Sequence, residues 1–99
     1  MYIVDLRHFL TEQGAIAPER GAARKMAEFY AATVARATAA PARAAPAPKC
    51  FKCKVISVKT SLGADLAVHW SCSVCGTAGR ISNWQGTLWD LTGDAEPKG

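Results

Sequence analysis

Two short stretches of this 99-residue chain decide its fold, Cys50-Phe51-Lys52-Cys53 and Cys72-Ser73-Val74-Cys75. Each is a C-x-x-C pair, and residues 54–71 separate them, a spacing typical of a four-cysteine metal site. Such a pair presents two thiolates from a tight turn, called a knuckle here, and two knuckles complete the tetrahedron that zinc prefers. Because protein ligands fill all four positions, we predict one structural zinc ion rather than a catalytic one.

The same cysteines admit other chemistry. Disulfides or a thioredoxin-like redox pair would also use C-x-x-C, but neither pair lies at a strand-to-helix junction, and two matched pairs favour a shared metal. Iron in a rubredoxin-like site takes the same four thiolates, so the sequence favours zinc without excluding iron. His69 lies close to Cys72 in the chain, but the closed site predicts that it is exposed or contacts a ligand without binding the metal itself.

The residues between and after the knuckles have the pattern of strands. Apolar residues alternate with polar ones over 56–60 and over 66–70, and Gly63 and Asp65 mark a turn between the two runs, so we predict a β-hairpin. A third strand is expected over Arg80–Trp84. The predicted sheet is therefore small, three-stranded and antiparallel.

This half of the chain resembles the zinc-ribbon family, in which two knuckles flank a hairpin and a further strand completes the sheet. The resemblance covers Lys49 to Leu91. Gly76 follows the second knuckle, where glycine typically relieves a strained backbone position, whereas Lys54 stands in the equivalent place after the first. A ribbon of about 45 residues has little apolar core, so the metal is expected to be part of the fold.

A second resemblance rests on two other stretches, Asp5-Leu6-Arg7-His8-Phe9-Leu10 and Arg80-Ile81-Ser82-Asn83-Trp84-Gln85-Gly86-Thr87-Leu88-Trp89-Asp90-Leu91. Both look like parts of a group of small bacterial proteins without assigned activity. This resemblance implies a bacterial protein and no particular function.

The N-terminal half of the chain is predicted to be helical. Pro18 suits a first helical position, and apolar residues recur at three- and four-residue spacing, so we predict an amphipathic helix over 18–40. Its apolar stripe consists of Met26, Phe29, Tyr30 and Val34. Asp5 is expected to cap a short helix running to about Gln13, unless Tyr2-Ile3-Val4 pairs instead as a brief strand.

An Ala/Pro-rich stretch joins the two halves. Residues 41–48 contain three prolines, which remove backbone donors and favour extended conformations, so we predict a semi-rigid linker. The predicted division is a helical segment over 1–40, a linker over 41–48, a zinc ribbon over 49–92 and a disordered tail over 93–99. The predicted fold class is α+β.

Charge and targeting signals narrow the function only slightly. The formal net charge is +4, with seven Lys/Arg against four Asp/Glu in residues 1–49 and five against four in residues 50–99. This excess permits contact with nucleic acid or an acidic protein without requiring it. The N-terminus lacks a secretory or transit signal, and no apolar run is long enough to span a membrane, so we expect a cytoplasmic protein.

The leading functional prediction is a non-catalytic binding module that associates with nucleic acid as an accessory or regulatory factor. Basic residues surround the first knuckle and the neighbouring strands, and nearby tryptophans offer stacking surfaces for bases. The candidate nucleic-acid surface consists of Lys52, Lys54, Lys59, Arg80 and Trp84. The plainer interpretation is that the lysines solubilise a small ribbon and the tryptophans pack over its sheet.

The alternative prediction is a protein-interaction adaptor. The helix stripe of Met26, Phe29, Tyr30 and Val34 either covers the ribbon's own sheet, which is the default expectation, or docks on another protein. The sequence contains no nucleophile-plus-base arrangement, no glycine-rich phosphate loop and no convergent carboxylate pair. We therefore predict neither an enzymatic activity nor a small-molecule substrate.

Overall fold

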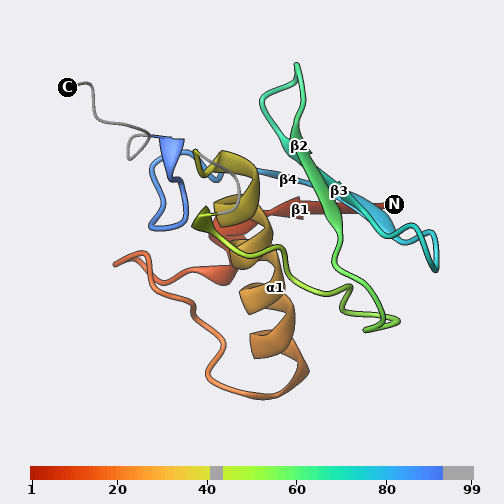
Figure 1. Ribbon diagram of the computed structural model, residues 1–99. Helices are drawn as coiled ribbons and strands as arrows, with labels where there is room; N and C mark the ends of the chain where they lie inside the picture. Colours follow the sequence, from red (N-terminus) through yellow and green to blue (C-terminus); the bar gives the residue numbers. More distant parts are fainter. Residues whose placement is uncertain (41–43, 93–99) are drawn as a thin grey trace.

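The computed structural model describes residues 1–40 and 44–92. Figure 1 shows the helix α1 lying across one face of a twisted sheet, which confirms the predicted α+β class. In chain order the elements are β1 (Tyr2–Asp5), the 3-10 helix η1 (Leu6–Phe9), α1 (Gly21–Thr38), β2 (Lys59–Leu62), β3 (Val68–Ser71) and β4 (Ala78–Ser82).

The sheet has four strands in the order β1-β4-β3-β2. Strands β2, β3 and β4 are antiparallel neighbours, as predicted, whereas β1 pairs parallel with β4 and places Tyr2 opposite Gly79. The prediction of three antiparallel strands was therefore wrong, because the sheet is mixed and has one strand more. Partners so far apart in the chain leave no local pattern that would reveal their pairing.

The element boundaries also differ from those predicted. The helix begins at Gly21 rather than at Pro18 and ends at Thr38. The brief N-terminal strand is confirmed, and the predicted short helix after it is only the single turn η1, which Asp5 caps by accepting a hydrogen bond from the N–H of Arg7 at 3.0 Å. The third predicted strand lies two residues earlier, over Ala78–Ser82.

The apolar stripe of α1 packs on the inner face of the sheet. Phe29, Tyr30 and Val34 are buried in the core, and Met26 packs against the edge of that core. Alanines fill much of the rest of the helix, which favours helix formation and lets it approach the strands closely. The helix therefore covers the sheet of its own chain, as the default expectation held.

An aromatic cluster links the helix, the sheet and the first C-x-x-C pair. The ring of Phe51 lies edge-on to Phe29, Tyr2 and Trp70, with centroid separations of 5.2, 5.3 and 5.8 Å respectively. Phe29 and Trp70 are themselves in edge-to-face contact at 5.0 Å. Edge-to-face pairs contribute stability beyond the area they bury, so this cluster anchors Phe51, and the cysteine beside it, in the core.

Part of the predicted linker is packed rather than free. The carbonyl of Ala45, which is buried, accepts a hydrogen bond from the guanidinium of Arg36 at 3.2 Å. Residues 41–43 of the linker and the predicted disordered tail over 93–99 lie outside the described residues. Neither described helix combines the length and the apolar character that crossing a membrane demands.

Candidate metal centre

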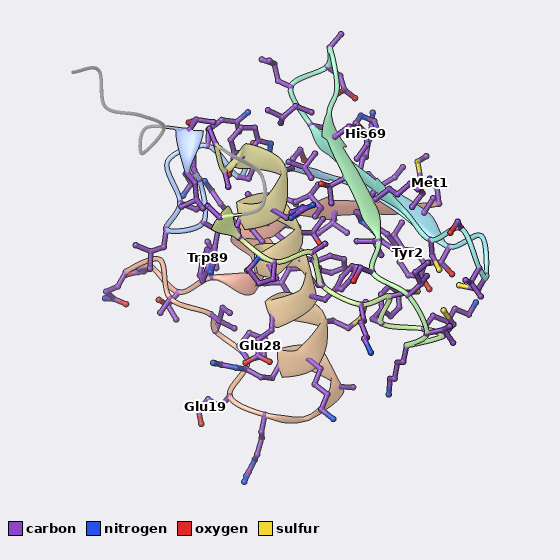
Figure 2. All side chains as sticks on the ribbon, in the orientation of Figure 1. Met1, Tyr2, Glu19, Glu28, His69 and Trp89 are labelled. Carbon is purple, nitrogen blue, oxygen red and sulfur yellow. The ribbon has the colours of Figure 1, made fainter. Side chains whose placement is uncertain are left out.

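The four predicted ligands lie together at one end of the sheet. The Sγ atoms of Cys50, Cys53, Cys72 and Cys75 all lie within 4.8 Å of one another. The separation is 3.7 Å from Cys50 to Cys75 and 3.6 Å from Cys53 to Cys72. Four metal–sulfur bonds of about 2.3 Å in a tetrahedron place the sulfurs about 3.8 Å apart. The thiols are therefore already close to the arrangement that a tetrahedral metal ion needs, and Figure 2 shows yellow sulfur atoms gathered there.

The first knuckle, residues 50–54, is a closed turn that lies in an irregular loop rather than between strands. The N–H of Lys54 donates to the carbonyl of Cys50 at 2.9 Å, which closes the turn. The N–H of Cys50 donates to the carbonyl of Ile56 at 3.0 Å, and an isolated bridge joins Lys49 to Ser57. No regular strand flanks this knuckle on either side within the described residues.

The second knuckle, residues 72–76, has the same turn, but paired strands flank it on both sides. The N–H of Gly76 donates to the carbonyl of Cys72 at 3.0 Å, the counterpart of the bond in the first knuckle. Here the turn directly joins β3 to β4, and the N–H of Cys72 continues their ladder by donating to the carbonyl of Thr77 at 2.8 Å. The sheet therefore fixes the position of the second knuckle.

Both knuckles end in the same unusual backbone conformation. The residue after the last cysteine has φ of 59° at Lys54 and 78° at Gly76, both in the left-handed region. Glycine adopts this region without strain, whereas a side chain such as that of lysine incurs an energetic cost there. The sequence suggested this equivalence of Lys54 and Gly76, and the structure confirms that the first knuckle carries the strained residue.

Hydrogen bonds to the sulfurs distinguish three of the thiols, those of Cys53, Cys72 and Cys75. Bonds from the Thr77 hydroxyl, 3.0 Å from the sulfur, and from the Thr77 N–H lower the pKa of Cys75 to about 6. The N–H groups of Cys75 and Val74 lower the pKa of Cys72. The N–H of Val55 acts in the same direction on Cys53, but desolvation and the neighbouring thiols outweigh it and raise its pKa to about 11. Cys72 and Cys75 of the second knuckle thus have more thiolate character than Cys53, and the thiolate is the form that binds metals.

The donor set restricts what this site can bind and do. Cys50 and Cys72 are buried, Cys53 is half-buried and Cys75 is exposed. Four thiolates in a tetrahedron suit zinc or iron rather than the hard cations that prefer oxygen. The described residues contain no other such group of ligands, and His69 does not belong to this one. The four cysteines can therefore hold one metal ion and fill its coordination sphere.

Two residues that support the site were missed by the sequence analysis. Phe51 anchors the first knuckle in the aromatic core, and Thr77, the residue just before β4, donates to Cys75. An aromatic residue immediately after a ligand cysteine was a signal for the first. Nothing in the sequence distinguished Thr77 from any other polar residue that follows a turn.

The residues of the candidate nucleic-acid surface differ in their exposure. Lys52, Lys54, Lys59 and Arg80 are exposed, but Trp84 is 5% exposed and its Nε1–H donates to the carbonyl of Leu66 at 3.1 Å. The buried indole of Trp84 therefore offers no free face to a base.

The sheet face opposite α1 carries its own small ionic cluster. Strand alternation and register place Lys59, His69 and Arg80 on this outer face, with Trp70 on the inner one. His69 Nε2 lies 3.1 Å from both carboxylate oxygens of Asp65, and Arg80 donates to the same carboxylate at 3.3 Å. The N–H of Ala67, then His69 and Arg80, lower the pKa of Asp65. These bonds brace the hairpin between β2 and β3.

The two stretches behind the second resemblance pack against each other. Beyond the pairing of β1 with β4, the guanidinium of Arg7 donates to the carbonyl of Gln85 at 2.6 Å. The side-chain amide of Asn83 donates to Asp5 at 2.8 Å. These sequences therefore hold the N-terminus against the segment after β4, which is a structural role.

A scan against protein-family models, a search of curated proteins and a search of solved structures each found no match to this chain.

Proposed function

We propose that this protein is a non-catalytic binding module whose fold is held by one structural zinc ion, and that it associates with nucleic acid. The observation that carries the zinc site is the mutual distance of at most 4.8 Å among the sulfurs of Cys50, Cys53, Cys72 and Cys75. In this proposal residues 49–92 are a zinc ribbon to which β1 adds a parallel edge strand. Zinc is favoured over iron because redox-inert structural sites of this kind are the commoner use of four thiolates.

We propose no catalytic role for the zinc ion because its four cysteine ligands would fill its coordination sphere. A catalytic zinc ion keeps one position for water or substrate, whereas four cysteine ligands leave none. The metal instead joins two knuckles that are far apart in the chain, and its binding free energy adds to the stability of the fold. This contribution matters in a domain with so small an apolar core.

The metal can be tested on protein expressed in the cytosol and purified without chelator. Elemental analysis should find one equivalent of zinc per chain, and the protein should lack the visible absorption of an iron–thiolate centre. Iron in place of zinc would change the identity of the metal and leave its structural role intact. A fully folded chain that contains no metal would overturn the proposal.

Support for nucleic-acid association comes from exposed, mainly unpaired cations. Lys52 and Lys59 are exposed and have no ion pair among the described residues, and Arg80 lies on the same outer sheet face as Lys59. Because Trp70 and Trp84 are both buried, base stacking contributes little. The expected mode is contact with the phosphate backbone, which is insensitive to sequence and weakens steeply with salt.

Fluorescence anisotropy with short single- and double-stranded DNA and RNA tests this part. Binding should be saturable at low salt, and Lys52→Glu or Lys59→Glu should weaken it and reduce the salt slope by about 1. Lys25→Glu, the same charge change on α1, is the matched control. If binding is absent at low salt, or if all three variants weaken it equally, the proposed nucleic-acid surface is wrong.

The adaptor alternative has a narrower basis than the sequence suggested. Phe29, Tyr30 and Val34 are at most 6% exposed, so a partner cannot reach most of the stripe in this fold. Met26 alone among the four keeps an intermediate exposure. A protein partner would therefore have to bind where Met26 meets a second element, and not along the stripe itself.

A further inference from the structure

An apolar groove of about 680 Å³ runs between the first half of α1 and the first knuckle. Met26 and Phe29 of the helix form one side of its floor, and Pro48 and Phe51 form the other. This volume is within the range of roughly 300–1,000 Å³ that is usual for ligand-binding clefts. The groove therefore has the size and the apolar lining of a binding site, and it adjoins the candidate metal site, with which it shares Cys50.

The rim of this groove is positively charged on both sides. Lys25 stands on the helix side, and Lys49 and Lys54 stand on the knuckle side. None of the three has an ion pair within the part of the chain that the structure describes. The one acidic residue at the rim, Glu28, is paired with Arg24 at 2.8 Å. The groove thus presents three free ammonium groups around an apolar floor.

This combination of charge and shape selects one kind of occupant. An amphipathic helix placed in a groove fills the floor with apolar side chains spaced three and four residues apart, while its flanking residues meet the two walls. Cations on both walls favour acidic residues on both flanks of such a helix and disfavour basic ones. Nucleic acid fits less well, because a phosphate backbone would leave the apolar floor without a partner.

We propose that this groove binds an amphipathic helix of a partner protein that carries acidic residues on both sides of its apolar stripe. Met26 and Phe51 are the apolar anchors, and Lys25 and Lys54 select for acidic flanks. Because Phe51 and Lys54 belong to the first knuckle, the metal site holds one wall of the groove in place. This surface shares Lys54 with the candidate nucleic-acid surface but contains neither Lys52 nor Lys59, the residues changed in the nucleic-acid test, so the two proposals can fail separately.

The test uses the zinc-loaded full chain and two synthetic helical peptides with the same leucine stripe. One peptide carries glutamates on both flanks and the other carries lysines. Isothermal titration calorimetry should show saturable binding of the glutamate peptide and at least tenfold weaker binding of the lysine peptide. Amide shifts in a ¹H–¹⁵N spectrum should centre on residues 22–32 and 48–54. Equal binding of both peptides, no binding of either, or shifts centred elsewhere would overturn the proposal.

Matched variants then distinguish binding in the groove from non-specific attraction of the acidic peptide to the positive charge of the protein. Lys25→Glu and Met26→Gln should each weaken binding of the glutamate peptide by roughly tenfold, the scale of a central interface residue. Lys59→Glu makes the same charge change on β2, outside the groove, and should leave peptide binding within about twofold of the unaltered chain. If Lys59→Glu and Lys25→Glu weaken it equally, the attraction is non-specific and the groove is not the site. Amide spectra of all three variants establish that they are folded.

Discussion

The two knuckles have the same local geometry but are supported very differently. Each closes with a hydrogen bond to the carbonyl of its first cysteine, 2.9 Å long in the first knuckle and 3.0 Å in the second. The second knuckle joins two paired strands, whereas the first is held by an irregular loop and by the side chain of Phe51. In the proposed zinc-bound state, the sheet fixes the position of the second knuckle, and the metal would link the first knuckle to it.

The largest expected effect is the loss of a buried cysteine from the proposed metal site. Cys50 is 0% exposed in the first knuckle, whereas Cys75 is exposed in the second. We expect Cys50→Ser to lose the metal and cooperative thermal unfolding, because the buried position admits no substitute ligand. Cys75→Ser should keep a weakly bound metal, since water can reach the vacant position. The measurements are metal content after dialysis against a competing chelator and unfolding followed by circular dichroism.

The outcome of this pair tests whether the metal belongs to the fold. If Cys50→Ser were metal-free and melted like the unaltered protein, the metal would not contribute to stability. If both variants lost the metal equally, the burial of the ligand would not decide its importance.

The next effect concerns where the protein loosens when the metal is removed. Amide exchange in the chelated protein should accelerate over residues 49–57 by at least roughly tenfold more than over residues 70–79, because only the second set is held by a strand ladder. Hydrogen exchange measured by NMR, with and without chelator, gives the comparison residue by residue. Equal acceleration in both segments would show that the sheet does not hold the second knuckle independently.

The third prediction tests whether close packing of the sheet stabilises the second knuckle. A methyl group at Gly79, opposite Tyr2 in the sheet, would lie 2.7 Å from the Tyr2 carbonyl oxygen and 2.9 Å from Cζ2 of Trp70. Gly79→Ala should therefore destabilise the protein by about 2 kcal/mol, typical of an overpacked core. Denaturant unfolding of the metal-loaded protein measures this, with exposed Ser71→Ala as the control. A change below that of the control would show that β1 and Trp70 shift at no cost.

The same contrast explains how far the sequence could predict the structure. Local spacing predicts three features that the structure shows: the clustering of the four cysteines, the hairpin turn at Gly63 and Asp65, and the packing of the apolar helix stripe on the sheet. The strand β1 was one of two alternatives that the sequence offered, but its parallel pairing could not be predicted, because its partner β4 lies at the other end of the chain. The burial of Trp84 agrees with the plainer interpretation of the sequence, that the tryptophans pack over the sheet, and not with its assignment to a nucleic-acid surface.

The smallest expected effect comes from exchanging the residues that end the two knuckles. At Gly76 an added Cβ would meet no atom within 4 Å, so a substitution there changes only the strain of its positive φ. Gly76→Lys should destabilise by about 1 kcal/mol, and Lys54→Gly should stabilise by up to about 1 kcal/mol by relieving the strain at φ 59°.

The double variant Lys54→Gly/Gly76→Lys keeps the composition and net charge of the chain and is the natural control for this exchange. If the knuckles are independent once the metal is bound, the two free-energy changes should add within about 0.5 kcal/mol and leave the stability nearly unchanged. Denaturant unfolding of the metal-loaded proteins measures all three variants. If Lys54→Gly lowered the free energy of unfolding instead, contacts of the lysine side chain would stabilise the first knuckle by more than its backbone strain destabilises it.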